Sequence, residues 1–242
     1  MVGQRLGLVV GSALSAAALV PGAERRAVDG GEGRTGPVLD AGHVVVLARH
    51  GLDRFVPAHL VDHHANVAAL CAAGCDRVVA TASVGSLHPD LRVGSVLVPD
   101  DVLALGVAPT YVDDERGHRV PTVDGPWRVA VLEAWSRVSD RPARHGGTYA
   151  MTSGPRFETP AEIRFLAAHA DVVGMTVPAE LFLAGEAGLA YAAVCQVDNL
   201  ANGLEADPLA LDGYHANVAG LAERLLDDLR ALTTDLAGRP RP

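Results

Sequence analysis

Residues 147–162 read GTYAMTSGPRFETPAE. The β-branched run at 148–152 predicts a strand, and the Gly154-Pro155 pair predicts the turn that ends it. Thr159-Pro160 and Glu162 then have the residue types of a helix N-cap, a first-turn proline and a first-turn acid. The stretch therefore predicts a strand, a short turn and a helix in that order.

The predicted turn carries an aromatic residue and an acid, Phe157 and Glu158. A planar ring at a strand end can stack on a heterocycle, and a carboxylate beside it can accept a hydrogen bond from a ring N–H. The same letters also fit a structural interpretation, in which Phe157 belongs to the core and Glu158 favours the helix N-terminus. The turn by itself supports both interpretations equally.

Short β-branched runs alternate with longer helix-like segments along the chain, which predicts an α/β fold with a largely buried sheet. We expect strands at 6–10, 44–47, 77–80, 95–98, 148–152, 172–173 and 190–197. We expect helices at 61–73, 127–138, 160–168, 179–185 and 214–236. Glycines at 30–33 predict a hairpin turn, and 112–126 predicts a polar surface loop. We expect a single domain over 1–238 and a flexible tail at 239–242.

The 242-residue chain is 49% apolar, which is ample for a core, and has a formal net charge of −9. This charge argues against a general nucleic-acid or anionic-membrane binder, because such proteins need a basic surface to displace counterions from phosphates. Every basic residue other than histidine is arginine, which excludes a P-loop lysine, a Schiff base and a lysine general base. A local group of arginines can still bind a small anion.

The cysteines, Cys71, Cys75 and Cys195, are too few for a disulfide framework, and we expect buried thiols in a reducing compartment. The apolar run at 6–20 superficially resembles a short secretory signal, and a secreted binding protein is one alternative. A strand that enters a Gly11-Ser12 turn and a small-residue helix explains the same letters. No other stretch reaches membrane-spanning length without charge, and we expect a cytoplasmic protein.

Several motifs occur in an order that resembles the trimeric purine nucleoside phosphorylases and their methylthioadenosine phosphorylase relatives. They cover nearly the whole chain and lie at 9–12, 48–51, 80–87, 93–100, 147–162, 174–180 and 194–199. The resemblance implies a single-domain nucleoside phosphorylase-like fold with a mixed central β-sheet flanked by helices. It also implies a homotrimer in which a neighbouring chain closes each sugar pocket, and Tyr111 and His64 are candidates for that contact.

The resemblance implies a phosphate subsite formed by Ser12, Arg49, His50, Ala82, Ser83 and Thr176. A glycine before Ser12 lets the backbone approach an anion, and the serine hydroxyl donates to it. Arg49 offers a planar donor fork and His50 a further donor. An adjacent Arg and His at a solvated strand end, and a close-packed turn at 80–87, are the structural alternatives.

The chain departs from the pattern of its relatives at two positions of this subsite. Relatives often carry a polar side chain where this chain has Ala82, so only backbone donation carries over there, and Ser83 compensates. Relatives carry a glutamate directly after the proline, whereas Ala179 intervenes here between Pro178 and Glu180. These departures motivate the alternative of a non-catalytic nucleoside-binding protein.

The resemblance implies a nucleoside subsite formed by Phe157, Glu158, Met175, Asn199 and His215. Glu158 accepts from the N1–H that only a 6-oxopurine has, and Asn199 contacts N7 or the base edge. A competing assignment makes Asp198 the base contact. It shifts the strand by one residue, which would turn the side chain to the other face of the sheet. His215 is implied to bind the ribose 5′-hydroxyl, while a buried methionine and a lone histidine are ordinarily structural or inert.

The implied reaction is phosphorolysis of a purine nucleoside, with inosine or guanosine favoured, to free base and ribose 1-phosphate. Asn199, Glu158 and His50 are the expected catalytic residues. Phosphate is a co-substrate, and we expect neither a metal nor an organic cofactor. The alternative substrates are S-methyl-5′-thioinosine and 5′-methylthioadenosine, which Arg49-His50 and the helix after it support.

Overall fold

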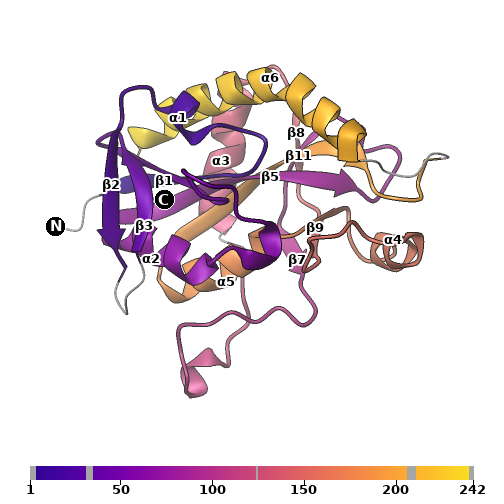
Figure 1. Cartoon of the computed structure of the whole chain (residues 1–242), viewed down its shortest axis with the longest axis horizontal. Helices are drawn as coiled ribbons and strands as arrows, with labels where there is room; N and C mark the ends of the chain where they lie inside the picture. The colour runs from indigo at the N-terminus through magenta and orange to yellow at the C-terminus, as the bar shows by residue number, and fades with distance from the viewer. Residues whose placement is uncertain (1–3, 31–34, 124, 206–210, 240–242) are drawn as a thin grey trace.

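The computed structural model describes residues 4–30, 35–123, 125–205 and 211–239, and within them the strands form one eleven-stranded sheet. The main path of this mixed sheet runs β2-β3-β4-β1-β5-β10-β9-β7 (Figure 1). A branch leaves β5 through β11 and β6 to β8. The strands are β1 (Arg5–Val10), β2 (Glu24–Asp29), β3 (Thr35–Asp40), β4 (Val44–Ala48), β5 (Cys75–Ser86), β6 (Val96–Val98), β7 (Asp101–Leu103), β8 (Ala143–His145), β9 (Thr148–Met151), β10 (Val172–Gly174) and β11 (Ala190–Leu200).

The sheet divides at β5. The first half of this 12-residue strand pairs with β1, and its last residues, Gly85 and Ser86, pair with both β10 and β11. Strands β1, β4, β5 and β11 are parallel to one another. Their carboxyl ends therefore reach the same edge of the sheet, which is where open α/β sheets bind ligands.

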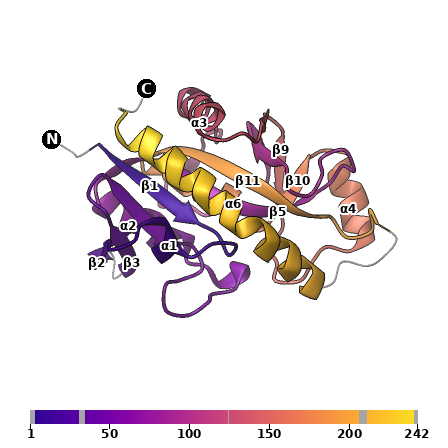
Figure 2. The same cartoon turned by 90° about the horizontal axis from the view of Figure 1, so that it is seen from above.

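Helices cover both faces of the sheet, and each face has its own buried core. On one face α2 (His63–Ala72) and α5 (Val177–Glu186) contribute aliphatic side chains such as Leu70 and Leu183. On the other lie α1 (Ala16–Leu19), α3 (Gly125–Val138) and α6 (Leu211–Ala237), with Trp127 and Trp135 fully buried. Figure 2 shows α6 crossing over β1, β5 and β11. A third, smaller cluster joins α4 (Pro160–Ala167) to β9 and β10.

Each strand and helix that the sequence predicts is present. β5 corrects one expectation, because residues 81–86 continue the strand instead of forming a glycine turn. A Cβ on Gly85 would lie 3.2 Å from the Asn199 side chain, so glycine lets two strands approach β5 here. The sequence did not reveal β2, β3, β7 or β8. β2 is almost entirely exposed, and neither β7 nor β8 has a buried residue, so none of the three shows the buried apolar run that β6 and β10 show at the same short length.

Three further expectations concern the connecting segments. β2 and β3 pair antiparallel, as a hairpin at 30–33 requires, although 31–34 lie outside the described residues. The loop at 112–126 contains a short 3₁₀ helix, Glu115–Gly117, and gives way to α3 at Gly125. Of the expected tail, Arg239 accepts a hydrogen bond from Arg77 at 2.7 Å, and 240–242 lie outside the described residues. Among the described helices, none is long and apolar enough to cross a membrane.

Candidate active site

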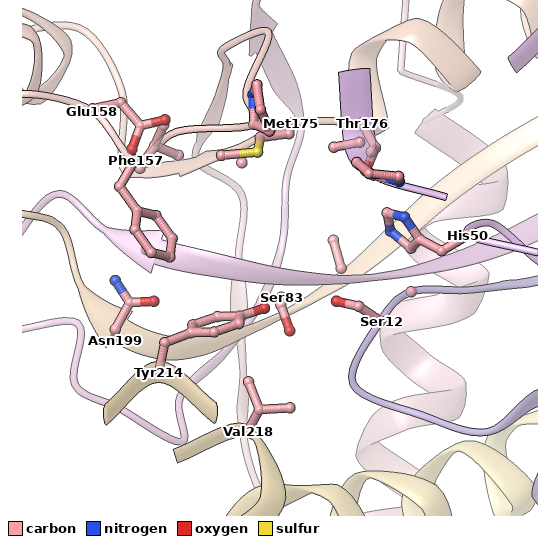
Figure 3. A pocket seen from close by; sticks show the side chains of 18 of the residues that line it. Ser12, His50, Ser83, Phe157, Glu158, Met175, Thr176, Asn199, Tyr214 and Val218 are labelled. Atoms are coloured by element: carbon pink, nitrogen blue, oxygen red, sulfur yellow. The ribbon is translucent and has the colours of Figure 1, made fainter. Parts of the chain in front are cut away.

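A cavity of about 620 Å³ opens at the carboxyl ends of the parallel strands. All the residues that the sequence assigns to a ligand line it: Ser12, Arg49, His50, Ala82, Ser83, Phe157, Glu158, Met175, Thr176, Asn199 and His215. They follow or belong to β1, β4, β5, β9, β10, β11 and α6. The fold therefore brings side chains from separate motifs around a single space (Figure 3).

One end of the cavity carries Phe157, Glu158 and Asn199 (Figure 3). Glu158 is only 6% exposed, and its Oε1 accepts a hydrogen bond from the Thr152 hydroxyl at 2.6 Å. The Glu158 backbone carbonyl accepts from the Asn202 side chain at 2.9 Å. A carboxylate has about four lone-pair positions, so the fixed side chain can still accept from a ligand N–H. The sequence analysis did not identify Thr152 or Asn202 as supports.

The turn that holds Phe157 and Glu158 is fixed by the start of α4. Thr159 is the N-cap, and its side chain and that of Glu162 accept from each other's backbone N–H groups, at 3.3 and 2.7 Å. This confirms the predicted helix start. Gly154 adopts a φ of +61°, and a Cβ there would lie 2.5 Å from the Met175 sulfur. Glycine is therefore required for the turn and Met175 to lie against each other.

A bulge in β11 separates the roles of two neighbouring side chains. The register with β5 shifts between Val197 and Asn199, which makes Asp198 the extra residue. Asn199 lines the cavity, and its Nδ2 donates to the Leu200 carbonyl at 2.8 Å, which leaves a second N–H on the same amide. Asp198 is fully buried behind the wall. The structure thus places Asn199, and not Asp198, at the surface of the cavity.

The first turns of α6 form part of the cavity wall beside Phe157. The ring of Tyr214 meets that of Phe157 edge-on, with the centroids 5.8 Å apart. His215 lines the cavity while remaining solvent-exposed, and Val218 lines it one turn later. The sequence analysis missed Tyr214 and Val218, although their i, i+4 spacing next to His215 was the available signal.

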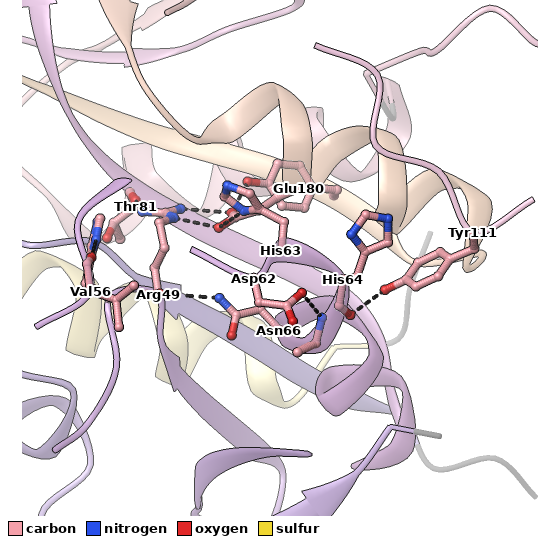
Figure 4. Close-up of polar contacts among 12 residues, drawn as sticks. Arg49, Val56, Asp62, His63, His64, Asn66, Thr81, Tyr111 and Glu180 are labelled. Atoms are coloured by element: carbon pink, nitrogen blue, oxygen red, sulfur yellow. Dashed lines mark hydrogen bonds and ion pairs between the residues drawn. The ribbon is translucent and has the colours of Figure 1, made fainter. Parts of the chain in front are cut away.

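Arg49 lies at the other end of the cavity in a buried ion pair (Figure 4). Its Nε and Nη2 donate to the two carboxylate oxygens of Glu180 at 2.5 and 2.9 Å, and its Nη1 donates to the Thr81 carbonyl at 2.6 Å. Tyr191 donates to the same carboxylate at 2.7 Å. Burial alone would raise the pKa of Glu180, but the charge and hydrogen bonds of Arg49 hold it well below its ordinary range. Arg49 keeps two N–H groups beyond these bonds, on Nη1 and Nη2.

Glu180 occurs in the motif at 174–180, where Ala179 interrupts the usual order. Helix α5 begins at Val177, and Glu180 still reaches Arg49. The intervening Ala179 therefore does not prevent Glu180 from pairing with Arg49. The sequence analysis gave Glu180 no role, because nothing in the local sequence indicated a partner 131 residues away.

His50 presents an acceptor to the cavity. Its Nδ1 lies 2.8 Å from the Val56 carbonyl, which can only accept, so Nδ1 carries a proton. Burial lowers the pKa of His50, which favours the neutral ring at pH 7. In that tautomer the one N–H of the ring is used by the Val56 carbonyl and Nε2 is an acceptor, so the neutral ring has no further N–H for phosphate. It can instead accept a hydrogen bond from a P–OH group.

Thr176 and Ser12 complete this end of the cavity (Figure 3). Thr176 is 5% exposed and occupies the N-cap position of α5 without a side-chain capping bond. The N-terminus of this 10-residue helix therefore begins beside the cavity wall, with the Thr176 and Val177 backbone N–H groups turned toward the Tyr149 hydroxyl. Ala82 is buried, and Ser12 is exposed at the end of β1.

Tyr111 and His64 lie outside the residues that line the cavity. The Tyr111 hydroxyl donates to the His64 carbonyl at 2.6 Å, and the two rings meet edge-on (Figure 4). Within the described ranges, no group of three or more His, Cys, Asp or Glu side chains is arranged to hold a metal ion.

Comparison with known proteins bears on this arrangement. The chain is 37% identical over 205 residues to a probable 6-oxopurine nucleoside phosphorylase of Moorella thermoacetica, covering 81% of this chain and 76% of the relative. It is 29% identical over 226 residues to a probable S-methyl-5′-thioinosine phosphorylase of Methanocaldococcus jannaschii, covering 91% and 88%. A structure of methylthioadenosine phosphorylase from Schistosoma mansoni in complex with adenine has the same fold, with a TM-score of 0.81, 23% identity and coverage of 98% and 93%.

The match extends over the whole arrangement of strands and helices that surrounds the cavity. The model of the phosphorylase superfamily matches residues 4–233, from the first strand of the sheet into the last helix. On this match and on the similarity to its relatives, the chain belongs to the phosphorylase superfamily.

Proposed function

We propose that the protein is a pentosyltransferase that cleaves purine nucleosides with inorganic phosphate, releasing the free base and ribose 1-phosphate. One observation carries the proposal: a single cavity has a base-sized end with a fixed carboxylate and amide, and an opposite end suited to phosphate. The relatives named as 6-oxopurine nucleoside phosphorylases support the same activity.

The phosphate end positions the nucleophile. Ser12, Thr176 and the remaining N–H groups of Arg49 bind the phosphate oxygens, together with the backbone at Ala82. His50 accepts a hydrogen bond from the P–OH group of HPO₄²⁻, which keeps its proton at this stage, and so fixes which oxygen faces the sugar. An unprotonated phosphate oxygen then forms a bond to C1′ while the C1′–N9 bond breaks. The negative phosphate stabilises the positive charge that develops on the ribose.

The base end stabilises the leaving group. The electron pair of the C1′–N9 bond moves into the purine, and the second amide N–H of Asn199 stabilises charge that develops at N7. Glu158 accepts from N1–H, which a 6-oxopurine carries and adenine lacks, so inosine and guanosine are favoured. Phe157 stacks on the ring. The proton that HPO₄²⁻ contributes ends on the released base.

Two observations favour S-methyl-5′-thioinosine as a second candidate substrate. Relatives named as S-methyl-5′-thioinosine phosphorylases match up to 91% of the chain. The cavity is also lined by apolar Phe55, Pro57 and Val218, which can contact a methylthio group. The base end suits this compound equally, because it too is a 6-oxopurine.

The proposal extends to assembly and location. We propose a homotrimer in the cytoplasm that needs no metal or organic cofactor, with phosphate as co-substrate. The resemblance in the sequence supports the trimer, and sedimentation of the purified protein tests it. Dialysis against EDTA is expected to leave activity unchanged.

The deciding experiment measures release of free purine from inosine, guanosine, adenosine, S-methyl-5′-thioinosine and 5′-methylthioadenosine, each with and without phosphate. We expect phosphate-dependent release from 6-oxopurine nucleosides. Preference for a methylthio compound would favour the second candidate and remove the role of His215 at a 5′-hydroxyl. Binding of inosine without release of hypoxanthine would show a nucleoside-binding protein instead.

A further inference from the structure

Ser83 lies between the two ends of the cavity. Figure 3 places it in the middle, with Asn199 to one side and Ser12 to the other. A nucleoside that meets phosphate at C1′ must have its sugar between the base and the phosphate. Ser83 is therefore at the level of the sugar, on the wall formed by β5.

The Ser83 hydroxyl is already committed as a donor. It donates to Oδ2 of Asp198, the extra residue of the β11 bulge. Asp198 is fully buried, and its Oδ1 accepts from Nε2 of Gln196 at 3.0 Å. The carboxylate thus lies directly behind the cavity wall and contacts it through Ser83.

A chain of hydrogen bonds fixes the direction of donation as far as Asp198. Arg141 always carries its protons and donates through Nη1 to Oε1 of Gln196 at 3.0 Å. Its Nε donates to Asp228 on α6 at 2.9 Å. Since Gln196 accepts through its oxygen, its amide nitrogen must face Asp198. Oδ1 of Asp198 is therefore held as an acceptor, and only Oδ2 can change its role.

We propose that Asp198 is a positioning residue that makes Ser83 a hydrogen-bond acceptor for a ribose hydroxyl of the bound nucleoside. The inference rests on the proposed function and adds a contact that selects the sugar. Because the single proton of Ser83 points at Asp198, the serine oxygen shows only lone pairs to the cavity. It cannot donate to phosphate in this state, and the partner that fits it is an O–H donor.

Substitution of Asp198 by asparagine tests this polarity. Gln196 must still donate to residue 198, so the asparagine oxygen takes the place of Oδ1 and its NH₂ group faces Ser83. Ser83 then accepts from that NH₂ and turns its own proton into the cavity. Burial raises the pKa of Asp198, although the hydrogen bonds from Ser83 and Gln196 act to lower it. A protonated Asp198 would donate to Ser83 as the NH₂ group of the asparagine does. The Asp198→Asn variant therefore keeps the shape of the side chain at position 198 and reverses the direction of the hydrogen bond between it and the Ser83 hydroxyl.

The experiment compares wild type, Ser83→Ala, Asp198→Asn and the double variant on inosine, 2′-deoxyinosine and 3′-deoxyinosine at saturating phosphate. Wild type is expected to prefer inosine over one deoxy compound by about three- to tenfold, the effect of one net hydrogen bond. Ser83→Ala is expected to lose that preference, Asp198→Asn to lower it because the ribose hydroxyl must then accept instead of donate, and the double variant to lose no more than Ser83→Ala. The KM for phosphate is expected to stay within about twofold in Ser83→Ala and to stay equal or fall in Asp198→Asn. Ser86→Ala, on the same strand but bonded to the His88 carbonyl, is the matched control.

Two outcomes overturn the proposal. One is an unchanged preference among the three nucleosides in Ser83→Ala. The other is a rise in the phosphate KM of Ser83→Ala without a change in sugar preference, which makes Ser83 a phosphate ligand. Ser83→Ala decides the question if Asp198→Asn does not fold. Calorimetric binding of the three nucleosides gives the sugar preference without turnover, so an inactive wild type would reject the proposed function separately.

Discussion

At the scale of single residues, the direction of each hydrogen bond matters more than the identity of the residue. Glu158 and His50 both present acceptors to the cavity, one through a carboxylate and one through an imidazole nitrogen. In the proposed reaction, acceptors at the two ends select for N–H on the base and P–OH on the phosphate. The proposed specificity follows from these two atoms.

Glu158→Gln is expected to lower kcat/KM for inosine at least about tenfold, because an amide keeps one acceptor and the Thr152 hydroxyl already donates to it. The new NH₂ can donate to the unprotonated N1 of adenosine, so the ratio of adenosine to inosine cleavage is expected to rise. Steady-state kinetics on both nucleosides measure it. An unchanged ratio would remove Glu158 from base recognition.

The pKa of His50 is expected to lie below the ordinary value of about 6.5, because burial disfavours the charged ring. The neutral form is then present throughout the range above that pKa, with its proton on Nδ1. Two-dimensional ¹H–¹⁵N spectra of the imidazole nitrogens across pH 5 to 8 report both the pKa and the tautomer. His50→Gln assigns the signals, and a proton on Nε2 alone would contradict the prediction.

The motifs in the sequence indicated most of the polar residues that line the two ends of the cavity, because each motif is local and contiguous, but they did not indicate Tyr214 or Val218. It could not indicate that His50 accepts, since the orienting Val56 carbonyl belongs to a loop with no recognisable pattern. It also left Asp198 and Asn199 as alternatives. A bulge of one residue decides between them, and bulges have no reliable signature in a single sequence.

At the scale of secondary-structure elements, close packing between β9, β10 and the start of α5 sets the position of Met175 and Thr176. Tyr149 of β9 is fully buried, and its hydroxyl lies where a Cβ on Gly174 of β10 would be, at 2.0 Å. The strand end that leads to Met175 and Thr176 therefore has no room for a side chain at Gly174.

Gly174→Ala is expected to destabilise the protein by about 1–3 kcal/mol, the usual range for overpacking a core. Urea unfolding followed by circular dichroism measures the loss. Tyr149→Phe removes the oxygen, so Gly174→Ala is expected to cost less in that background than in wild type. Equal costs in both backgrounds would show that the contact with the hydroxyl is not the cause.

The longer elements were predictable because burial imposes a pattern on them. β1, β4 and β11 are apolar runs and α4 has a complete capping box. The exposed strands were not predictable, since β2 reads as Glu24–Asp29 with three charges before its first apolar residues, whereas β6 and β10, which are shorter but buried, were predicted. These strands form by pairing with a neighbour that the local sequence does not reveal.

At the scale of the whole molecule, the Arg49–Glu180 pair connects the end of β4 to α5 across the sheet face. Both side chains are 1% exposed. Removal of one partner from such a pair leaves an uncompensated charge in the interior. The pair therefore links the proposed phosphate subsite to the stability of the fold.

Glu180→Gln is expected to lower the free energy of unfolding by about 3–5 kcal/mol at pH 7. Because the pKa of Glu180 is lowered in the folded state, its contribution is fully present above the unfolded value of about 4.3 and declines as the pH falls below it. The difference from wild type should therefore shrink in acid. Glu186→Gln, on the same helix, is the control. A difference that grows as the pH falls would contradict the assignment.

The bulge in β11 also changes which side of the sheet each following side chain faces. Side chains alternate from one side of the sheet to the other, and the one additional residue at Asp198 resets that alternation before the strand ends. Two consecutive polar residues can then serve the same binding site, one from behind its wall and one from within. Deletion of a single residue here would leave the hydrophobic first half of the strand in register with β5. It would turn the Asn199 side chain away from the position proposed for the base. In this strand the proposed specificity depends on the number of residues as much as on the side chains.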